Sequence, residues 1–192
     1  MHALPAAPAG AKRRQLFVGT AVASAAAASL VLSMCALWLR MRDQARAAGT
    51  AWLPDGASIP EVAANVMLIS FLPLCIFAQW VVYAVKRDDG RHTKVAAGLV
   101  TVIGLMVLNA QAYVWAQIKL PAGGGTYQSM FFTLTGVMAA AIAAGVVWAA
   151  VIAVKAVAGR TIDREVAASH ALYWYALSAA FAVLWFVVYV TK

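Results

Sequence analysis

The feature that most constrains this chain is a long stretch without charge. No Asp, Glu, Lys or Arg occurs between Lys119 and Lys155. Roughly 20 apolar residues are enough for an α-helix to cross a bilayer. The stretch exceeds that length even after its glycine-rich start, PAGGGT at 121–126, is set aside as a turn. Residues 128–154 are therefore predicted to form a membrane-spanning helix.

The composition extends this prediction to the whole chain. Hydrophobic residues make up 64% of it and charged residues only 11%, against about 25% charged residues in soluble domains. Inside a bilayer every backbone amide needs a partner within the protein, which leaves helices or a closed barrel. The apolar runs lack the period-two alternation of barrel strands, so the predicted fold class is all-α.

Uncharged runs separated by charged segments predict five spanning helices in a single membrane domain, 15–192, after a short tail at 1–14. The predicted helices are 15–39, 62–85, 95–118, 128–154 and 166–191. The connections on the tail's side are short, which leaves no room for a soluble domain. The loop between the first two helices is the longest, and it is a candidate contact for a partner.

The distribution of Lys and Arg predicts the orientation. The tail and the two connections on its side hold ten of the 15 basic residues, and the opposite side holds five. Because cytoplasmic loops carry the excess of basic residues, the N-terminus is predicted to be cytoplasmic and the C-terminus outside, in the plasma (inner) membrane. Since the basic residues cluster at helix ends, the net charge of +8 indicates membrane topology and not nucleic-acid binding.

No catalytic, cofactor-binding or metal-ligating residue is predicted. All seven acidic residues fall in loops or at helix ends, so a proton relay built on buried carboxylates is not expected. Cys35 and Cys75 lie within predicted helices, where cysteine usually behaves as a small hydrophobic residue. His2, His92 and His170 fall on or near the tail's side and are predicted to be exposed.

Polar and small side chains inside the helices are the candidate contacts between helices. Small residues four apart let helices approach closely, and polar groups in hydrocarbon seek partners on neighbouring helices. We expect the tightest internal contacts on the first and fourth helices. The candidates for packing or interhelical polar contacts are Ser24, Asn65, Asn109, Gln111, Thr133, Thr135, Gly136, Ala140, Ala144, Tyr173 and Trp174.

Aromatic residues gather near the ends of the predicted helices. Trp and Tyr are enriched where membrane meets water, so these side chains are predicted to be interfacial anchors. On the outer side they are Trp38, Trp52, Tyr113, Trp115, Tyr127 and Tyr189. On the inner side they are Trp80, Tyr83, Trp148, Tyr173, Trp174 and Tyr175.

Five segments in the same order resemble subunit III of the haem-copper oxidases, in its five-helix form. The segment SMFFTLTG at 129–136 is similar to the start of a core helix in that family, and NAQAYVW at 109–115 to its QAYEW pattern. LYWYALSAAFAVLWFVVYV at 172–190 resembles LYWHFVDVVWIFLFTVVYL. The first helix, ending LWLR, looks like the FLASE-type helix, and PEVAANVMLISFLPLCIFAQWVVYAVKRDD resembles the corresponding second helix.

This chain departs from the family where the family carries ionisable groups. Neutral residues stand at the positions of the family's buried Glu, the Glu of QAYEW, the FHGLH histidines, the Glu before LYW, and the His and Asp of WHFVD. They are Ala25, Val114, Met138, Ala141, Ala168, Tyr175 and Ser178. These departures argue against a role in proton uptake or lipid coordination, while leaving a framework for helix packing.

The resemblance implies a non-catalytic subunit that packs against oxidase subunit I, and subunit II, among membrane lipids. It places haem and copper in partner subunits and no cofactor in this chain, with room for a bound phospholipid. Two alternatives stay open. One is an accessory subunit that bridges an oxidase to another membrane complex, and the other is a small transporter motivated by Pro73, Gln79, Asn109 and Gln111.

Overall fold

In the computed structural model, residues 14–54, 56–57, 59–121 and 123–191 are described. They form five α-helices and no strand: α1 (Gln15–Ala47), α2 (Glu61–Lys86), α3 (Gly90–Ile118), α4 (Thr126–Val157) and α5 (Arg164–Trp185), continued by one π-helical turn, η1 (Phe186–Val190). All five are long and apolar enough to cross a membrane, which confirms the predicted fold class. The predicted tail lies outside the described residues, apart from Arg14.

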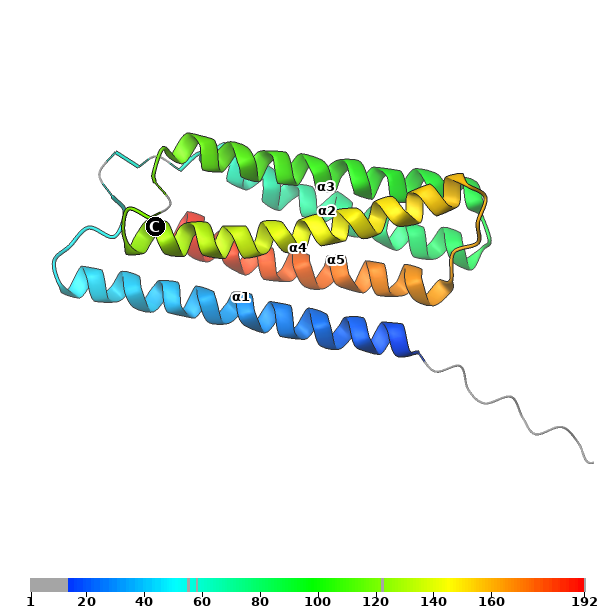
Figure 1. Ribbon diagram of the computed structural model, residues 1–192, viewed down its shortest axis with the longest axis horizontal. Helices are drawn as coiled ribbons and strands as arrows, with labels where there is room; N and C mark the ends of the chain where they lie inside the picture. Colours follow the sequence, from blue (N-terminus) through cyan, green and yellow to red (C-terminus); the bar gives the residue numbers. More distant parts are fainter. Residues whose placement is uncertain (1–13, 55, 58, 122, 192) are drawn as a thin grey trace, which may run out of the picture.

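The helices lie side by side in one elongated bundle (Figure 1). Helix α5 packs on α1 and α2, and α3 packs on α2 and α4, so that α1 and α4 end the series α1–α5–α2–α3–α4. Helix α4 closes the bundle through smaller contacts with α5 and α1. We call the end at which α1 begins the N-terminal end of the bundle, and the opposite end, where the chain stops, the C-terminal end (Figure 1).

Helix α1 is longer than predicted, because it continues from Leu39 to Ala47. The prediction ended the helix at the first arginine, but Arg is a good helix former and a cation near a helix C-terminus interacts favourably with the helix dipole. Arg40, Arg42 and Arg46 therefore belong to the helix and not to a loop.

The C-terminal end of the bundle is closed by an aromatic cluster. Trp52, from the connection between α1 and α2, meets Trp38 edge-on with ring centroids 5.2 Å apart, and Tyr127 lies 5.1 Å from Trp38 and 5.5 Å from Trp52. All three are buried, as is Tyr189. The prediction that these four are interfacial anchors is wrong, because Trp38, Trp52 and Tyr127 pack on one another inside the chain and Tyr189 packs edge-on against Phe131. The long connection is thus anchored to its own bundle.

At the N-terminal end, carboxylates cap two helices. Asp89 accepts a hydrogen bond from the His92 amide (3.0 Å) at the start of α3, and Asp163 accepts one from the Glu165 amide (2.7 Å) at the start of α5. Each satisfies an amide that has no partner within its helix. The backbone and side-chain hydrogen bonds from His92 lower the pKa of Asp89 below its ordinary value.

Candidate functional site

Helix α1 is held to the rest of the chain by a carboxylate at its first turn. The Phe17 amide donates to Glu165 Oε1 of α5 at 2.9 Å. That amide belongs to the first turn of α1, where no carbonyl of the same helix is available, so Glu165 caps α1 from a different helix. A carboxylate at this position also interacts favourably with the positive end of the helix dipole.

A second contact holds the other end of α1. Arg42 Nη1 donates to the Thr191 carbonyl oxygen at 2.6 Å and to Thr191 Oγ1 at 2.7 Å, just beyond the last turn of the chain. The Arg42 side chain is only 13% exposed and also pairs with Asp43 at 3.1 Å. Together, the Glu165–Phe17 and Arg42–Thr191 contacts join α1 to the last helical segment at both ends. We call them the two α1 clamps.

Between the two clamps, α1 packs through small residues. Ser24 is buried, and Thr20 and Ala28 are partly buried on the same face. A shallow cavity of about 50 Å³ lies there between α1, α4 and α5, with Ala141 and Tyr173 also in its wall. The Ser24 hydroxyl has no hydrogen-bond partner among the described residues. The predicted small-residue contact on α1 is therefore internal, as expected.

Two glycines of the other helices lie close against the Trp174 side chain. A Cβ atom added to Gly145 of α4 would lie 2.9 Å from the Trp174 ring and 3.0 Å from Tyr173. One added to Gly104 of α3 would lie 2.5 Å from Val146 and 3.4 Å from the same indole. The fully buried indole of α5 thus fits against glycines of two neighbouring helices.

Trp174 also orders a buried histidine. Its Nε1–H donates to His170 Nε2 at 3.0 Å, one turn earlier in α5, and Trp148 of α4 meets the imidazole edge-on at 5.7 Å. Because Nε2 accepts, the neutral ring carries its proton on Nδ1, which has no partner among the described residues. The prediction that His170 is exposed is wrong, because α5 begins at Arg164 and buries it.

Three further predicted polar contacts do join helices. Thr135 of α4 is fully buried and accepts from Trp115 Nε1 of α3 at 2.9 Å. The Tyr173 hydroxyl donates to the Ala141 carbonyl at 2.7 Å. Asn65 of α2 accepts from Trp185 Nε1 of α5 at 3.2 Å.

Gln111 is buried inside the bundle, but its amide nitrogen has no partner among the described residues. Asn109, two residues earlier on α3, is exposed. The two predicted polar candidates of this helix therefore lie on different faces.

The predicted small-residue contact on α4 is not internal. Ala140 and Ala144 are exposed, and Gly136 is partly exposed, with no atom within 4 Å of a Cβ built there. Thr133, one turn earlier, is also exposed and bonds only to the Ser129 carbonyl. We call Thr133, Gly136, Ala140 and Ala144 the outer stripe of α4. The expectation that it packs inside the chain is wrong, because the inward face of α4 is the one carrying Gly145.

The positions where the chain departs from the resembled family are dispersed over the structure. Val114 and Met138 are buried, Ala141 lines the shallow cavity beside α1, and Ala25 is exposed. Tyr175 is exposed and its hydroxyl donates to Gln79 of α2 at 2.8 Å. No group of three His, Cys, Asp or Glu side chains converges among the described residues.

Sequence reasoning missed Arg42, Glu165, Gly104 and Gly145. The two charged residues were interpreted only as marking helix ends, since their partners lie 149 and 148 residues away. The glycines carry no signal that separates them from Gly136. The helix-capping residues Asp89 and Asp163 were likewise interpreted only as acidic residues in loops.

The described fold defines a class, namely a five-helix bundle with spanning helices and a polar-poor interior. A scan of the sequence against protein-family models finds no matching family, and a search of curated proteins finds no significant match.

Proposed function

We propose that this chain is a non-catalytic, subunit III-like component of a respiratory haem-copper oxidase, and that it packs against the catalytic subunit I. The observation that carries the proposal is the succession of five sequence segments that resemble that family, each of which falls within or beside one of the five spanning helices. The chain would stabilise the catalytic subunit and its lipid surroundings in aerobic electron transport. Haem and copper would be bound by its partners.

The outer stripe of α4 supports this proposal. Small side chains let a neighbouring helix approach closely, and van der Waals packing drives helix association in lipid. The stripe begins within SMFFTLTG, a segment that closely resembles the start of a core helix in that family, and its alanines are left exposed by the described helices of this chain. We assign it to a helix of subunit I.

The distribution of charge supports an N-terminus in the cytoplasm and residence in the plasma membrane. The N-terminal end of the bundle carries Arg14 and the basic residues of the α2–α3 and α4–α5 connections. At the C-terminal end, one of the few basic residues, Arg42, is engaged with Thr191. Because Arg42 has a structural role at this end, its presence there is only weak evidence against the orientation that the positive-inside rule predicts.

The decisive experiment is mass spectrometry of the native complex after mild solubilisation. Oxidase subunits I and II should co-purify with this chain in equal amounts, and the isolated chain should show no haem absorbance. Stoichiometric haem in the isolated chain, or a complex free of oxidase subunits, would overturn the proposal.

A second candidate is an accessory subunit that bridges an oxidase to another membrane complex. It is favoured by the neutral residues at the family's ionisable positions, such as Val114 and Met138. The same mass spectra discriminate between the two: a second subunit III that retains its glutamates would establish the accessory role. No observation favours the transporter, since Gln79 lies in the last third of α2 and Asn109 in the last third of α3, at opposite ends of the bundle.

A further inference from the structure

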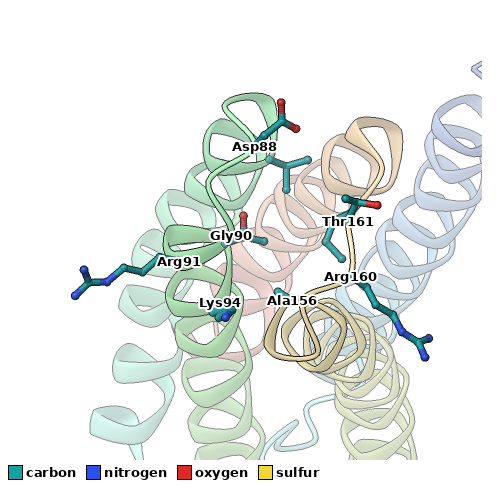
Figure 2. A pocket seen from close by; sticks show the side chains of 11 residues that line it. Asp88, Gly90, Arg91, Lys94, Ala156, Arg160 and Thr161 are labelled. Carbon is teal, nitrogen blue, oxygen red and sulfur yellow. The ribbon is translucent and has the colours of Figure 1, made fainter.

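A cavity of about 270 Å³ opens at the N-terminal end of the bundle, between the α2–α3 and α4–α5 connections (Figure 2). Apolar side chains from three segments contribute to its wall, namely Val85, Ala156 and Ile162. Gly90 and Gly159 also line the cavity, and they contribute only backbone atoms to its wall. The cavity therefore has a partly apolar wall and lies at one end of the membrane-spanning helices.

Three cations line this cavity, two from the first two turns of α3 and one from the α4–α5 connection. Lys94, in the second turn of α3, lines the cavity together with Ala156 of α4, and the side chains of Arg91 and Arg160 extend outward on opposite sides in Figure 2. All three cations are exposed, and none forms an ion pair or side-chain hydrogen bond with any residue that the structure describes. Their donors are free to engage a ligand.

The one carboxylate in the wall does not neutralise these cations. Asp88 lies at the upper rim in Figure 2, and its Oδ2 is 3.6 Å from Arg164 Nη2. The same Arg164 atom donates to the Lys86 carbonyl at 3.2 Å, which keeps the guanidinium beside Asp88. With Asp88 paired to Arg164, the charges of Lys94, Arg91 and Arg160 are left uncompensated.

We propose that this cavity binds the phosphate group of an anionic phospholipid from the adjoining leaflet. Lys94 would donate hydrogen bonds to the phosphate. The side chains of Arg91 and Arg160 point outward in this structure and would rotate toward the phosphate from opposite sides. Arg and Lys donors bind phosphate oxygens with strong, charge-assisted hydrogen bonds, and basic pockets between spanning helices suit anionic headgroups. The glycerol and upper acyl chain would follow the apolar wall. This site does not depend on the oxidase assignment.

The test uses the full chain in nanodiscs of phosphatidylcholine with rising amounts of phosphatidylglycerol, and native mass spectrometry of the lipids that stay bound. We expect one phosphatidylglycerol to be retained in preference to phosphatidylcholine. Each cation that contacts the bound phosphate should contribute about a fivefold change in retention of the lipid. The double variant Lys94→Gln, Arg160→Gln should therefore retain the anionic lipid about 25-fold more weakly.

Lys155→Gln is the matched control, because Lys155 is an exposed cation at the same end of the bundle that does not line the cavity. It should leave retention within about twofold of the unmodified chain. Equal loss in this control, or no preference for phosphatidylglycerol, would overturn the proposal. A parallel titration with inorganic phosphate distinguishes the source of the phosphate: competition at millimolar concentration would reject the lipid in favour of a soluble anion. Circular dichroism of each variant checks that the helices are intact.

Discussion

Arg42 illustrates how much one side chain can contribute when its partners are fixed. Its guanidinium satisfies the carbonyl and the hydroxyl of Thr191 at the very end of the described chain. Hydrogen bonds to a charged group contribute about 1.5–3 kcal/mol when they are shielded from water. Truncating Arg42 removes the donors and leaves the Thr191 carbonyl without this partner.

We therefore predict that Arg42→Ala loosens the C-terminal half of α1. The free energy of unfolding should fall by about 1.5–3 kcal/mol, and hydrogen exchange should accelerate in α1 but not in α3. Arg40→Ala is the control, since Arg40 is an exposed arginine of the same helix whose side chain forms no ion pair with the residues that the structure describes. Similar effects of the two substitutions would show that charge alone, and not the clamp, stabilises this end.

The cap of α3 predicts a pH dependence. Hydrogen bonds from His92 to the Asp89 carboxylate lower the pKa of Asp89. A carboxyl group whose folded pKa is lowered contributes stability above its unfolded pKa of about 3.9, and that stability is lost as the pH falls through the folded pKa. Protection of the first-turn amides of α3 should thus decrease only below about pH 4. In Asp89→Ala this decrease should be absent, and its persistence would assign the effect to another group.

Helix α4 has two faces that look alike in sequence and differ in the structure. Gly145→Ala would place a methyl group 2.9 Å from Trp174 and 3.0 Å from Tyr173, both held between helices. Overpacking of this kind costs about 1–3 kcal/mol. We predict that Gly145→Ala lowers the thermal stability of the isolated chain and weakens the contact between α4 and α5.

Gly136→Ala is the matched control on the same helix, because nothing lies within 4 Å of the added Cβ. Replacing a helical glycine by alanine in open space stabilises the helix by about 0.5–1 kcal/mol. The thermal midpoint of the isolated chain should stay the same or rise. A loss equal to that of Gly145→Ala would mean that the inward and outward faces have been exchanged.

The number of helices and the position of each apolar segment could be predicted because hydrocarbon forces every spanning segment to satisfy its own backbone. Their rotation could not. In a soluble helix the apolar face points inward, but lipid is as apolar as a protein core, so the outward face of α4 is as hydrophobic as the inward one. For this reason the stripe Gly136, Ala140, Ala144 and the contact of Gly145 could not be told apart in the sequence.

For the polar contacts, the sequence predicted which side chains bond between helices more readily than it predicted their partners. Thr135 and Tyr173 were expected to bond between helices, and they do. Their partners, Trp115 and the Ala141 carbonyl, could not be named, since pairing depends on how each helix is rotated. The buried aromatic cluster around Trp38 escaped prediction because tryptophan near a helix end is equally typical of an interfacial anchor.

At the scale of the whole molecule, the outer stripe of α4 is an exposed face on which we propose that a partner helix packs. We predict that Ala140→Leu leaves the isolated chain as stable as before, because Ala140 is exposed, but prevents close approach of a neighbouring helix. The amount of subunit I that co-purifies should fall about tenfold, as expected for overpacking of about 1.4 kcal/mol at an interface. Val102→Leu, on the exposed face of α3, should have no effect. Equal co-purification of Ala140→Leu and the unmodified chain would move the interface away from α4.

Orientation can be tested with single cysteines at the two ends of the bundle. In a chain whose own cysteines are replaced by alanine, Gly123→Cys and Ala158→Cys lie in exposed connections at opposite ends. An impermeant maleimide should label Gly123→Cys in intact cells and Ala158→Cys only after permeabilisation. The reverse pattern would contradict a cytoplasmic N-terminus.

The two α1 clamps have a consequence for how the protein is made. Phe17 is synthesised 148 residues before its partner Glu165, a delay of roughly 7 to 30 seconds at the usual rate of translation. During that interval α1 has only its minor contact with α4 to hold it, since its main neighbour is α5. Of these five helices, the one that is made first is therefore secured only after the last has been made. A ribosome that stops before α5 would release a nascent chain whose leading helix is open to capture by quality-control proteases.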